Sequence, residues 1–379
     1  MIYFDNAATT QMSEAALNAL MYASKECYGN PSSIYRYGKQ SKNLVDEARA
    51  IVAKCIGAEP EEIFFTSCGT ESDNWAVSQA ISQKCERVIT SKIEHHAILN
   101  SVYELEKAGM NTVYLPVDGG CVVDTDVLIN ILDGRKSFVS IMYQNNETGV
   151  IQPVKKVVDM VHEDNELSIV HTDAIQAVGH LRIDVKELGV DMLSASAHKF
   201  NGPKGIGFLY IKKGCLVSPL ILGGGQEKGL RSGTENVAGI YAMAKALEDN
   251  VERLDNHINQ IRILENKLFE GLNENNVEYW INANNSERAT GIINISIKDI
   301  DGEGLLNILD MHEICISIGS ACNSKIKEPS YVLTSMGLED DRIDAAVRIS
   351  LGRYNSSGEI EKLIANIVEY YKLIHFVNS

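Results

Sequence analysis

The sequence lacks the features that mark secreted, membrane-bound and nucleic-acid-binding proteins. No apolar run approaches the length of about 18 residues that a membrane span needs. The first ten residues have neither the basic start nor the apolar stretch of a secretory signal. Basic residues are in the minority, with 35 Lys and Arg against 51 Asp and Glu and a net charge of −16. Since this charge opposes the attraction that dominates nucleic-acid binding, we expect a cytoplasmic protein without direct contact to nucleic acid or membrane.

Closely spaced cysteine pairs are also missing. The eight cysteines include no CxxC pair, which argues against a zinc ribbon and a thioredoxin-like motif. Without a secretory signal, free thiols are expected. Cys315 lies between two isoleucines, as a buried structural cysteine does, whereas Cys322 lies among small polar residues, as a reactive thiol does. The residues alone therefore rank Cys322 first as a candidate nucleophile.

The order of apolar segments predicts an α/β fold. A chain of 379 residues favours two domains over one. Short apolar strands alternate with helical stretches, which indicates a mostly parallel, doubly wound sheet whose ligands bind beyond the carboxyl ends of the strands. The clearest helix is Pro153–His162, with valines at i, i+3, i+4 and i+7. The predicted strands are Glu62–Ser67, Arg87–Ser91, Asn111–Leu115, Ser137–Tyr143, Ser168–Thr172 and Val190–Ser194.

The last third of the chain follows a different pattern. From about 236 to 272, apolar residues recur every three or four positions, which predicts an unusually long helix that bridges two domains. We predict a segment 1–14 that packs with the smaller domain, a large domain over 15–250 and a small α+β domain over 251–379. The elements expected in the small domain are a strand at Ile292–Ile297, a helix near Gly304–His312, a strand at Ala346–Leu351 and a helix at Glu359–Ile374.

Three loops at predicted strand ends carry residues suited to chemistry. Thr66–Ser72 joins a strand to a helix, so it either binds a phosphate or forms an ordinary capped turn. Asp173 directly follows a strand, where it either caps a helix or pairs with a cationic ring nitrogen. Lys199 lies among small residues that would desolvate its amine for Schiff-base chemistry, unless it is an ordinary solvated lysine. Together, these groups are the ones that pyridoxal phosphate (PLP) requires.

Nine motifs occur in one order between Gly29 and Arg353, with YFDNAATT (Tyr3–Thr10) before them and SLGRY (Ser350–Tyr354) at their end, so they cover almost the whole chain. They are GNPSS (Gly29–Ser33), TSCGTESDN (Thr66–Asn74), EHHA (Glu94–Ala97), NNETG (Asn145–Gly149), HTDAIQ (His171–Gln176), SASAHKFNGPKGIG (Ser194–Gly207), GGGQEKGLRSGTEN (Gly223–Asn236), GSACNS (Gly319–Ser324) and VRISLGR (Val347–Arg353). In these motifs the chain resembles the cysteine desulfurases, which are PLP enzymes of fold type I in the class V aminotransferase family. The resemblance is greatest to the NifS/IscS-like branch.

The resemblance implies a role for each matching residue. Lys199 would form the Schiff base with PLP, His95 would stack on the cofactor ring, and Asp173 would pair with the pyridine nitrogen. Cys322, in a loop of the small domain, would be the nucleophile that takes sulfur from the substrate as a persulfide. The other implied contacts are Gly69, Thr70, Ser196 and His198 with the phosphate, Asn146 and Gln176 with the phenolic oxygen, Thr234 of the other subunit with the phosphate, and Arg348, assisted by Asn30, with the substrate carboxylate.

The implied activity is the PLP-dependent conversion of L-cysteine to L-alanine by a homodimer. The sulfur would pass to an acceptor protein such as an iron–sulfur scaffold, or to tRNA thiolation or nitrogenase maturation. No stable metal site is expected, because the neighbouring side chains of His95 and His96 point in different directions. Cys322 is a candidate only for transient iron–sulfur ligation. Two positions depart from the family pattern: Cys68, where a small residue such as Gly is usual, and Tyr35, where His is common.

Other activities remain open at this stage. Selenocysteine lysis, cysteine sulfinate desulfination and transamination use the same scaffold, but the GSAC segment favours persulfide chemistry because an aminotransferase needs no loop nucleophile. A PLP-binding sulfur-transfer scaffold without turnover is a further alternative, against which the presence of both Lys199 and Cys322 speaks. A nucleotide-binding protein is disfavoured, because no GxGxxG or GxxxxGK run follows a predicted strand.

Overall fold

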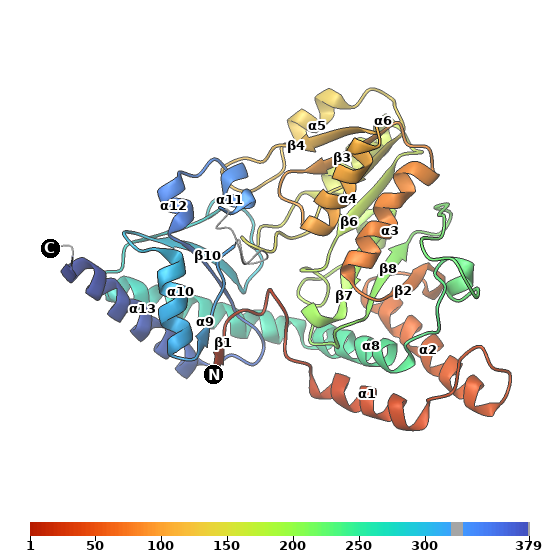
Figure 1. Cartoon of the computed structure of the whole chain (residues 1–379), viewed down its shortest axis with the longest axis horizontal. Helices are drawn as coiled ribbons and strands as arrows, with labels where there is room; N and C mark the ends of the chain where they lie inside the picture. Colours follow the sequence, from red (N-terminus) through yellow and green to blue (C-terminus); the bar gives the residue numbers. More distant parts are fainter. Residues whose placement is uncertain (320–328, 378–379) are drawn as a thin grey trace.

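The main sheet has seven strands and forms the larger part of the molecule (Figure 1). The computed structural model describes residues 1–319 and 329–377. The strands follow the order β2-β8-β7-β6-β5-β3-β4. Within this sheet β8 runs in the direction opposite to the other strands, which are parallel to one another. The predicted mostly parallel α/β fold is therefore confirmed. The bounds are β2 (Ile63–Thr66), β3 (Arg87–Ser91), β4 (Asn111–Leu115), β5 (Ser137–Ser140), β6 (Ile169–Asp173), β7 (Met192–Ser196) and β8 (Gly207–Ile211).

The central strands are buried on both faces, which explains their uninterrupted apolar runs. Along β5, Phe138 packs into the core on one face and Val139 into the core on the other, and Ile169 and Val170 repeat this along β6. One face is covered by α3 (Gly69–Ser82) and α4 (His96–Lys107). The helices that pack on the other face are α1 (Glu14–Glu26), α2 (Arg36–Cys55), α5 (Thr125–Ile131), α6 (Val154–Asp164), α7 (Val185–Leu188) and α8 (Val237–Glu252).

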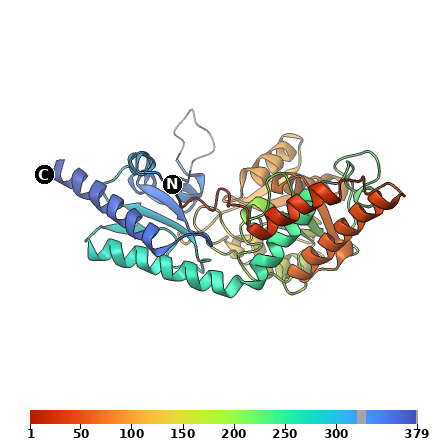
Figure 2. The same cartoon turned by 90° about the horizontal axis from the view of Figure 1, so that it is seen from below.

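Two helix predictions need correction. Pro153 is the residue before the first turn of α6 and not its first helical residue, although the four valines are buried as expected. The long periodic segment forms two helices, α8 and α9 (Leu254–Glu274), because the backbone of Arg253 leaves the helical conformation (φ −107°, ψ 11°). Together the two helices run from the large sheet to the small one (Figure 2).

A second core surrounds a three-stranded antiparallel sheet in the order β12-β10-β9. Its strands are β9 (Tyr279–Ile281), β10 (Ile292–Ile297) and β12 (Ala346–Ser350). Side chains of α9, α10 (Gly302–Met311) and α13 (Ser357–Val377) fill this core. The remaining elements are α11 (Tyr331–Ser335), α12 (Asp340–Asp344) and the 3-10 turns Pro60–Glu62, Ala197–Lys199 and Glu227–Gly229.

The N-terminal residues join this second core. The strand β1 (Ile2–Tyr3) pairs in parallel with β11 (Ile314–Cys315), and Phe4 is completely buried among the side chains of the second core. The boundaries 1–14, 15–250 and 251–379 stay predictions. No helix within the described ranges combines the length and the apolar composition that crossing a membrane requires.

Replacing Leu268 with Ala tests the second core. The side chain is fully buried on α9, so its removal leaves a cavity and lowers the free energy of unfolding by about 2–5 kcal/mol. Ile263 on the same helix is 66% exposed, so Ile263→Ala changes this free energy by no more than about 0.5 kcal/mol. Urea denaturation of both variants measures the difference, and equal losses would contradict the packing described for α9.

Candidate active site

A cavity of about 900 Å³ lies at the carboxyl ends of the parallel strands, where the small sheet adjoins the large one. The loops after β2, β3, β5, β6 and β7 all reach it, as expected for a doubly wound sheet. It brings together most of the predicted site residues, namely Gly69, Thr70, His95, Asn146, Asp173, Gln176, Ser196, His198, Lys199 and Arg348. Asn30 and Thr234 are exposed and do not line it, and Cys322 lies outside the described residues.

The N-terminus of α3 forms one wall of the cavity. Gly69 packs so closely that a Cβ atom there would lie 2.2 Å from the Cδ1 atom of Ile175. Opposite, Ser196 Oγ is buried without a hydrogen-bond partner among the described residues, and His198 Nδ1 lies 3.1 Å from Thr9 Oγ1. Backbone amides at a helix start beside an unused hydroxyl favour an anionic group such as a phosphate.

Asp173 is the last residue of β6, Lys199 follows the neighbouring strand β7, and both line the cavity. The Lys199 ammonium donates hydrogen bonds to the carbonyl oxygens of Ala7 at 2.5 Å and Ala8 at 3.0 Å. The Asp173 carboxylate accepts the Ile175 N–H at 2.9 Å. Burial raises the pKa of Asp173 to about 6, while this hydrogen bond and the charge of Lys199 act in the opposite direction. Asp173 thus still ionises near neutral pH, as a partner for a cationic ring nitrogen must.

His95 is the residue that precedes α4, and its ring is fixed by the helix it caps. Its Nδ1 accepts the Ala97 N–H at 3.1 Å, so the neutral ring carries its proton on Nε2. Burial lowers the pKa of His95 to about 4, and the charges of Lys199 and His96 act in the same direction. The side chain is therefore a neutral imidazole at physiological pH.

Arg348 brings three separate parts of the chain together. From β12, its guanidinium donates to Asn146 O at 3.0 Å and to Asp5 Oδ1 at 2.8 Å, and its Nε is buried without a hydrogen-bond partner among the described residues. Asp5 was missed as a site residue because its contact depends on the N-terminus crossing to the small sheet. The motif around it, YFDNAATT, was the available signal.

Glu147 is a second site residue that sequence reasoning missed. It is buried, and its carboxylate accepts the Ser330 hydroxyl at 2.5 Å. Gly319 approaches so closely that a Cβ atom there would lie 2.3 Å from Glu147 Oε2. Burial raises the pKa of Glu147 to about 7, whereas Ser330 and Arg348 act to lower it. Glu147 thus lies against both Gly319 and Ser330.

These groups fit PLP. The cofactor needs an amine for the Schiff base, a carboxylate for the ring nitrogen and donors for the phosphate. Lys199, Asp173 and the N-terminus of α3 supply them in one cavity, and the side-chain oxygens of Ser196 and Asn146 are buried there with no hydrogen-bond donor in the described part of the chain. Within that same part, no cluster of three or more His, Cys, Asp or Glu residues is arranged to hold a metal ion.

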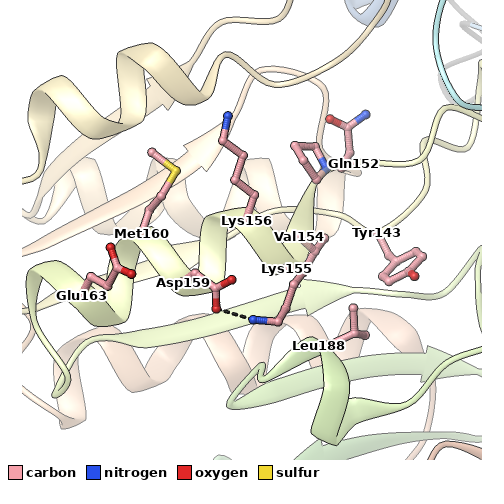
Figure 3. A pocket seen from close by; sticks show the side chains of 10 residues that line it. Tyr143, Gln152, Val154, Lys155, Lys156, Asp159, Met160, Glu163 and Leu188 are labelled. Carbon is pink, nitrogen blue, oxygen red and sulfur yellow. Dashed lines mark hydrogen bonds and ion pairs between the residues drawn. The ribbon is translucent and has the colours of Figure 1, made fainter.

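A second depression, of about 630 Å³, lies along α6 away from these residues (Figure 3). Lys155 and Asp159 form an ion pair across one turn of the helix there, and Tyr143 and Leu188 line the opposite side. It contains no predicted site residue that the structure describes. The chemistry-bearing residues thus gather in the larger cavity.

Comparison with known proteins agrees with this geometry. Residues 2–363 match the family described as aminotransferase class V, so the chain belongs to the class V aminotransferase family. It is 43% identical over 371 residues to "Cysteine desulfurase IscS" of Methanosarcina thermophila, covering 97% of this chain and 91% of that protein.

Two solved structures extend the comparison to the fold. The one described as "NIFS-LIKE PROTEIN" is 38% identical, with a TM-score of 0.91 and coverage of 98% of this chain and 99% of the other. The one described as "SspA in complex with cysteine" is 31% identical, with a TM-score of 0.83 and coverage of 94% and 100%. The predicted NifS/IscS-like resemblance is therefore confirmed.

The protonation of His95 can be measured directly. Because burial lowers its pKa, the ring should stay neutral as the pH falls from 8 and gain a proton only near pH 4. NMR titration of protein with 13C-labelled histidine checks this, with His95→Gln to assign the signal. A His95 signal that titrates near the usual histidine value of about 6.5 would contradict the description of this site.

Proposed function

We propose that this chain is a PLP-dependent cysteine desulfurase that converts L-cysteine to L-alanine. The observation that carries the proposal is the meeting of Lys199, Asp173 and Arg348 in one cavity at the strand ends. Membership of the class V aminotransferase family and full-length similarity to proteins named cysteine desulfurase support it. The "SspA in complex with cysteine" structure supports the choice of substrate.

The cavity offers a contact for each part of the cofactor. Gly69, Thr70, Ser196 and His198 would hold the phosphate, assisted by the start of α3. His95 would stack on the ring, and Asp173 would pair with the ring nitrogen. Asn146 and Gln176 would contact the phenolic oxygen, and Lys199 would form the covalent link. The cofactor supplies an electron sink that makes the substrate α-proton acidic and allows the Cβ–S bond to break.

Three side chains have separate roles in substrate binding and proton transfer. Arg348 binds the substrate carboxylate through its Nε–H, which is buried without a hydrogen-bond partner among the described residues, while Asp5 balances part of its charge. Lys199, once released from the cofactor, accepts the α-proton of the substrate. His95, neutral and fixed at the start of α4, is placed to relay protons near the reacting atoms.

Cys322 takes up the sulfur atom of the substrate. The thiolate attacks the sulfur of L-cysteine, the Cβ–S bond breaks, and a persulfide forms on Cys322 while the three-carbon product takes up protons and leaves as alanine. One cysteine and one thiol thus give one alanine and one persulfide, with no external oxidant. An acceptor protein, such as an iron–sulfur scaffold, would then take the outer sulfur.

We further propose that the functional unit is a homodimer. Thr234 is exposed and lies outside the cavity of its own chain, so it is available to reach the phosphate of a second copy. The loop between α1 and α2 and the segment before Thr234 lie at the same end of the molecule (Figures 1 and 2). These two segments expose large apolar side chains, namely Tyr28, Ile34, Tyr35, Leu216 and Leu222. Exposed apolar side chains on two nearby segments are typical of an association surface.

Removal of the nucleophile tests the proposed reaction. Cys322→Ala should retain the yellow colour of bound PLP, because Lys199 and the phosphate contacts are intact, but lose sulfide release from L-cysteine by at least about a hundredfold. Absorbance spectra and a sulfide assay with a reductant measure the two properties.

Cys55→Ala is the matched control, since Cys55 lies at the end of α2 outside the cavity, and it should retain both properties. Full turnover by Cys322→Ala would refute the role of Cys322. A wild-type protein that binds PLP yet yields neither sulfide nor alanine would refute the activity itself.

A further inference from the structure

A second buried aspartate lies behind Asp173. Asp73, in the first turns of α3, is completely buried, and neither of its carboxylate oxygens has a hydrogen-bond partner among the described residues. An ionised carboxylate in such a place is poorly solvated, which makes its charge unfavourable. Its proximity to the cofactor site makes its protonation state relevant to the proposed chemistry.

The nearest basic side chain does not supply a charge. His171 Nε2 lies 3.8 Å from Asp73 Oδ1, but the two ring nitrogens of His171 lie 2.9 Å from the hydroxyls of Ser140 and Ser194. Burial lowers the pKa of His171 to about 3, so the ring is neutral. The contact with Asp73 is thus not a salt bridge at physiological pH.

Acidic groups dominate the surroundings of Asp73. Asp173 follows His171 by two residues on β6, so both side chains point to the face of the sheet that α3 covers. Burial first, and then the charge of Asp173, raise the pKa of Asp73 well above its usual range. Glu94 and Cys68 act in the same direction, and only the nearby hydroxyl of Ser194 opposes them. The groups that act on Asp73 thus include three acidic side chains and no cation.

Two buried carboxyl groups that act on each other disfavour double ionisation, so the one with better partners takes the charge. Asp173 has the Ile175 N–H at 2.9 Å and the charge of Lys199, whereas Asp73 has neither. We propose that Asp73 carries a proton at neutral pH and acts as a positioning residue that leaves Asp173 as the ionised partner of the cofactor ring. The second part of this inference rests on the proposed function, and the first part does not.

Asp73→Asn tests the proton directly, because Asn has the same shape and no charge. Infrared difference spectra of the holoenzyme at pH 7, wild type minus variant, should show the C=O band of a protonated carboxyl group. The exposed Asp126 is the matched control, and Asp126→Asn should show carboxylate bands only. Carboxylate bands for Asp73→Asn would overturn the proposal. If this variant does not fold, the same band sought in wild-type protein with 13C-labelled aspartate decides the question.

The pH dependence of unfolding gives a second readout. A folded-state pKa raised above the unfolded value means that folded Asp73 holds a proton that unfolded Asp73 releases above about pH 4. The unfolding equilibrium constant of wild type, relative to that of Asp73→Asn, should therefore rise about tenfold per pH unit, or about a hundredfold from pH 5 to 7. A ratio that stays constant over this range would contradict a protonated Asp73.

The visible absorbance of bound PLP tests the proposed role of Asp73. If Asp73 is already neutral, Asp73→Asn should leave the pH midpoint of the visible absorbance of bound PLP unchanged. A midpoint that moves by about one unit or more would mean that Asp73 is charged in the wild type and would overturn its proposed role. Since none of these measurements uses turnover, they are independent of whether the protein releases sulfide from cysteine.

Discussion

The parallel arrangement of the main sheet determines where the chemistry takes place. Parallel strands present their carboxyl ends at one edge, so the loops after β2, β3, β5, β6 and β7 meet although they are far apart in sequence. These strand ends contribute different groups: helix-start amides after β2, an imidazole after β3, an amide after β5, a carboxylate at the last residue of β6 and an amine after β7. Closing the site from the other side depends on Arg348, whose contacts join β12 to Asn146 and to Asp5.

Burial at this edge of the sheet affects the protonation of the side chains more than ion pairing does. The pKa values of His95 and His171 are lowered, and those of Asp173 and Glu147 are raised, and in each case desolvation is the largest cause. The result is neutral imidazoles at His95 and His171. Because the Asp173 side chain is buried, its charge is weakly screened and would interact strongly with a cationic ring nitrogen.

The local hydrophobic pattern predicted most strands of the main sheet, but it did not predict contacts between residues far apart in the sequence. The strands β3, β4 and β10 have the predicted bounds. Every residue of β3 and β10 is buried, which explains their apolar runs, whereas the edge strand β4 is only partly buried. By contrast, β8 and the interruption at Arg253 were missed, the latter because the hydrophobic period continues through it and neither Gly nor Pro marks it.

The same distinction applies to the site. Residues within known motifs, such as Lys199 and Asp173, were found from the sequence and lie in the cavity as expected. Asp5, Asp73 and Glu147 were not selected, although each lies within a quoted motif, because their importance comes from neighbours in other parts of the chain. The roles given to Cys322, Asn30 and Thr234 stay predictions.

The central claim is that sulfur from L-cysteine is carried by Cys322 of this chain. Mass spectrometry of the protein after brief treatment with L-cysteine, without reductant, tests it most directly. The account predicts one added sulfur atom on the peptide that contains Cys322, removed by a reductant, together with alanine in the supernatant. Added sulfur found only on peptides that contain other cysteines would contradict the account.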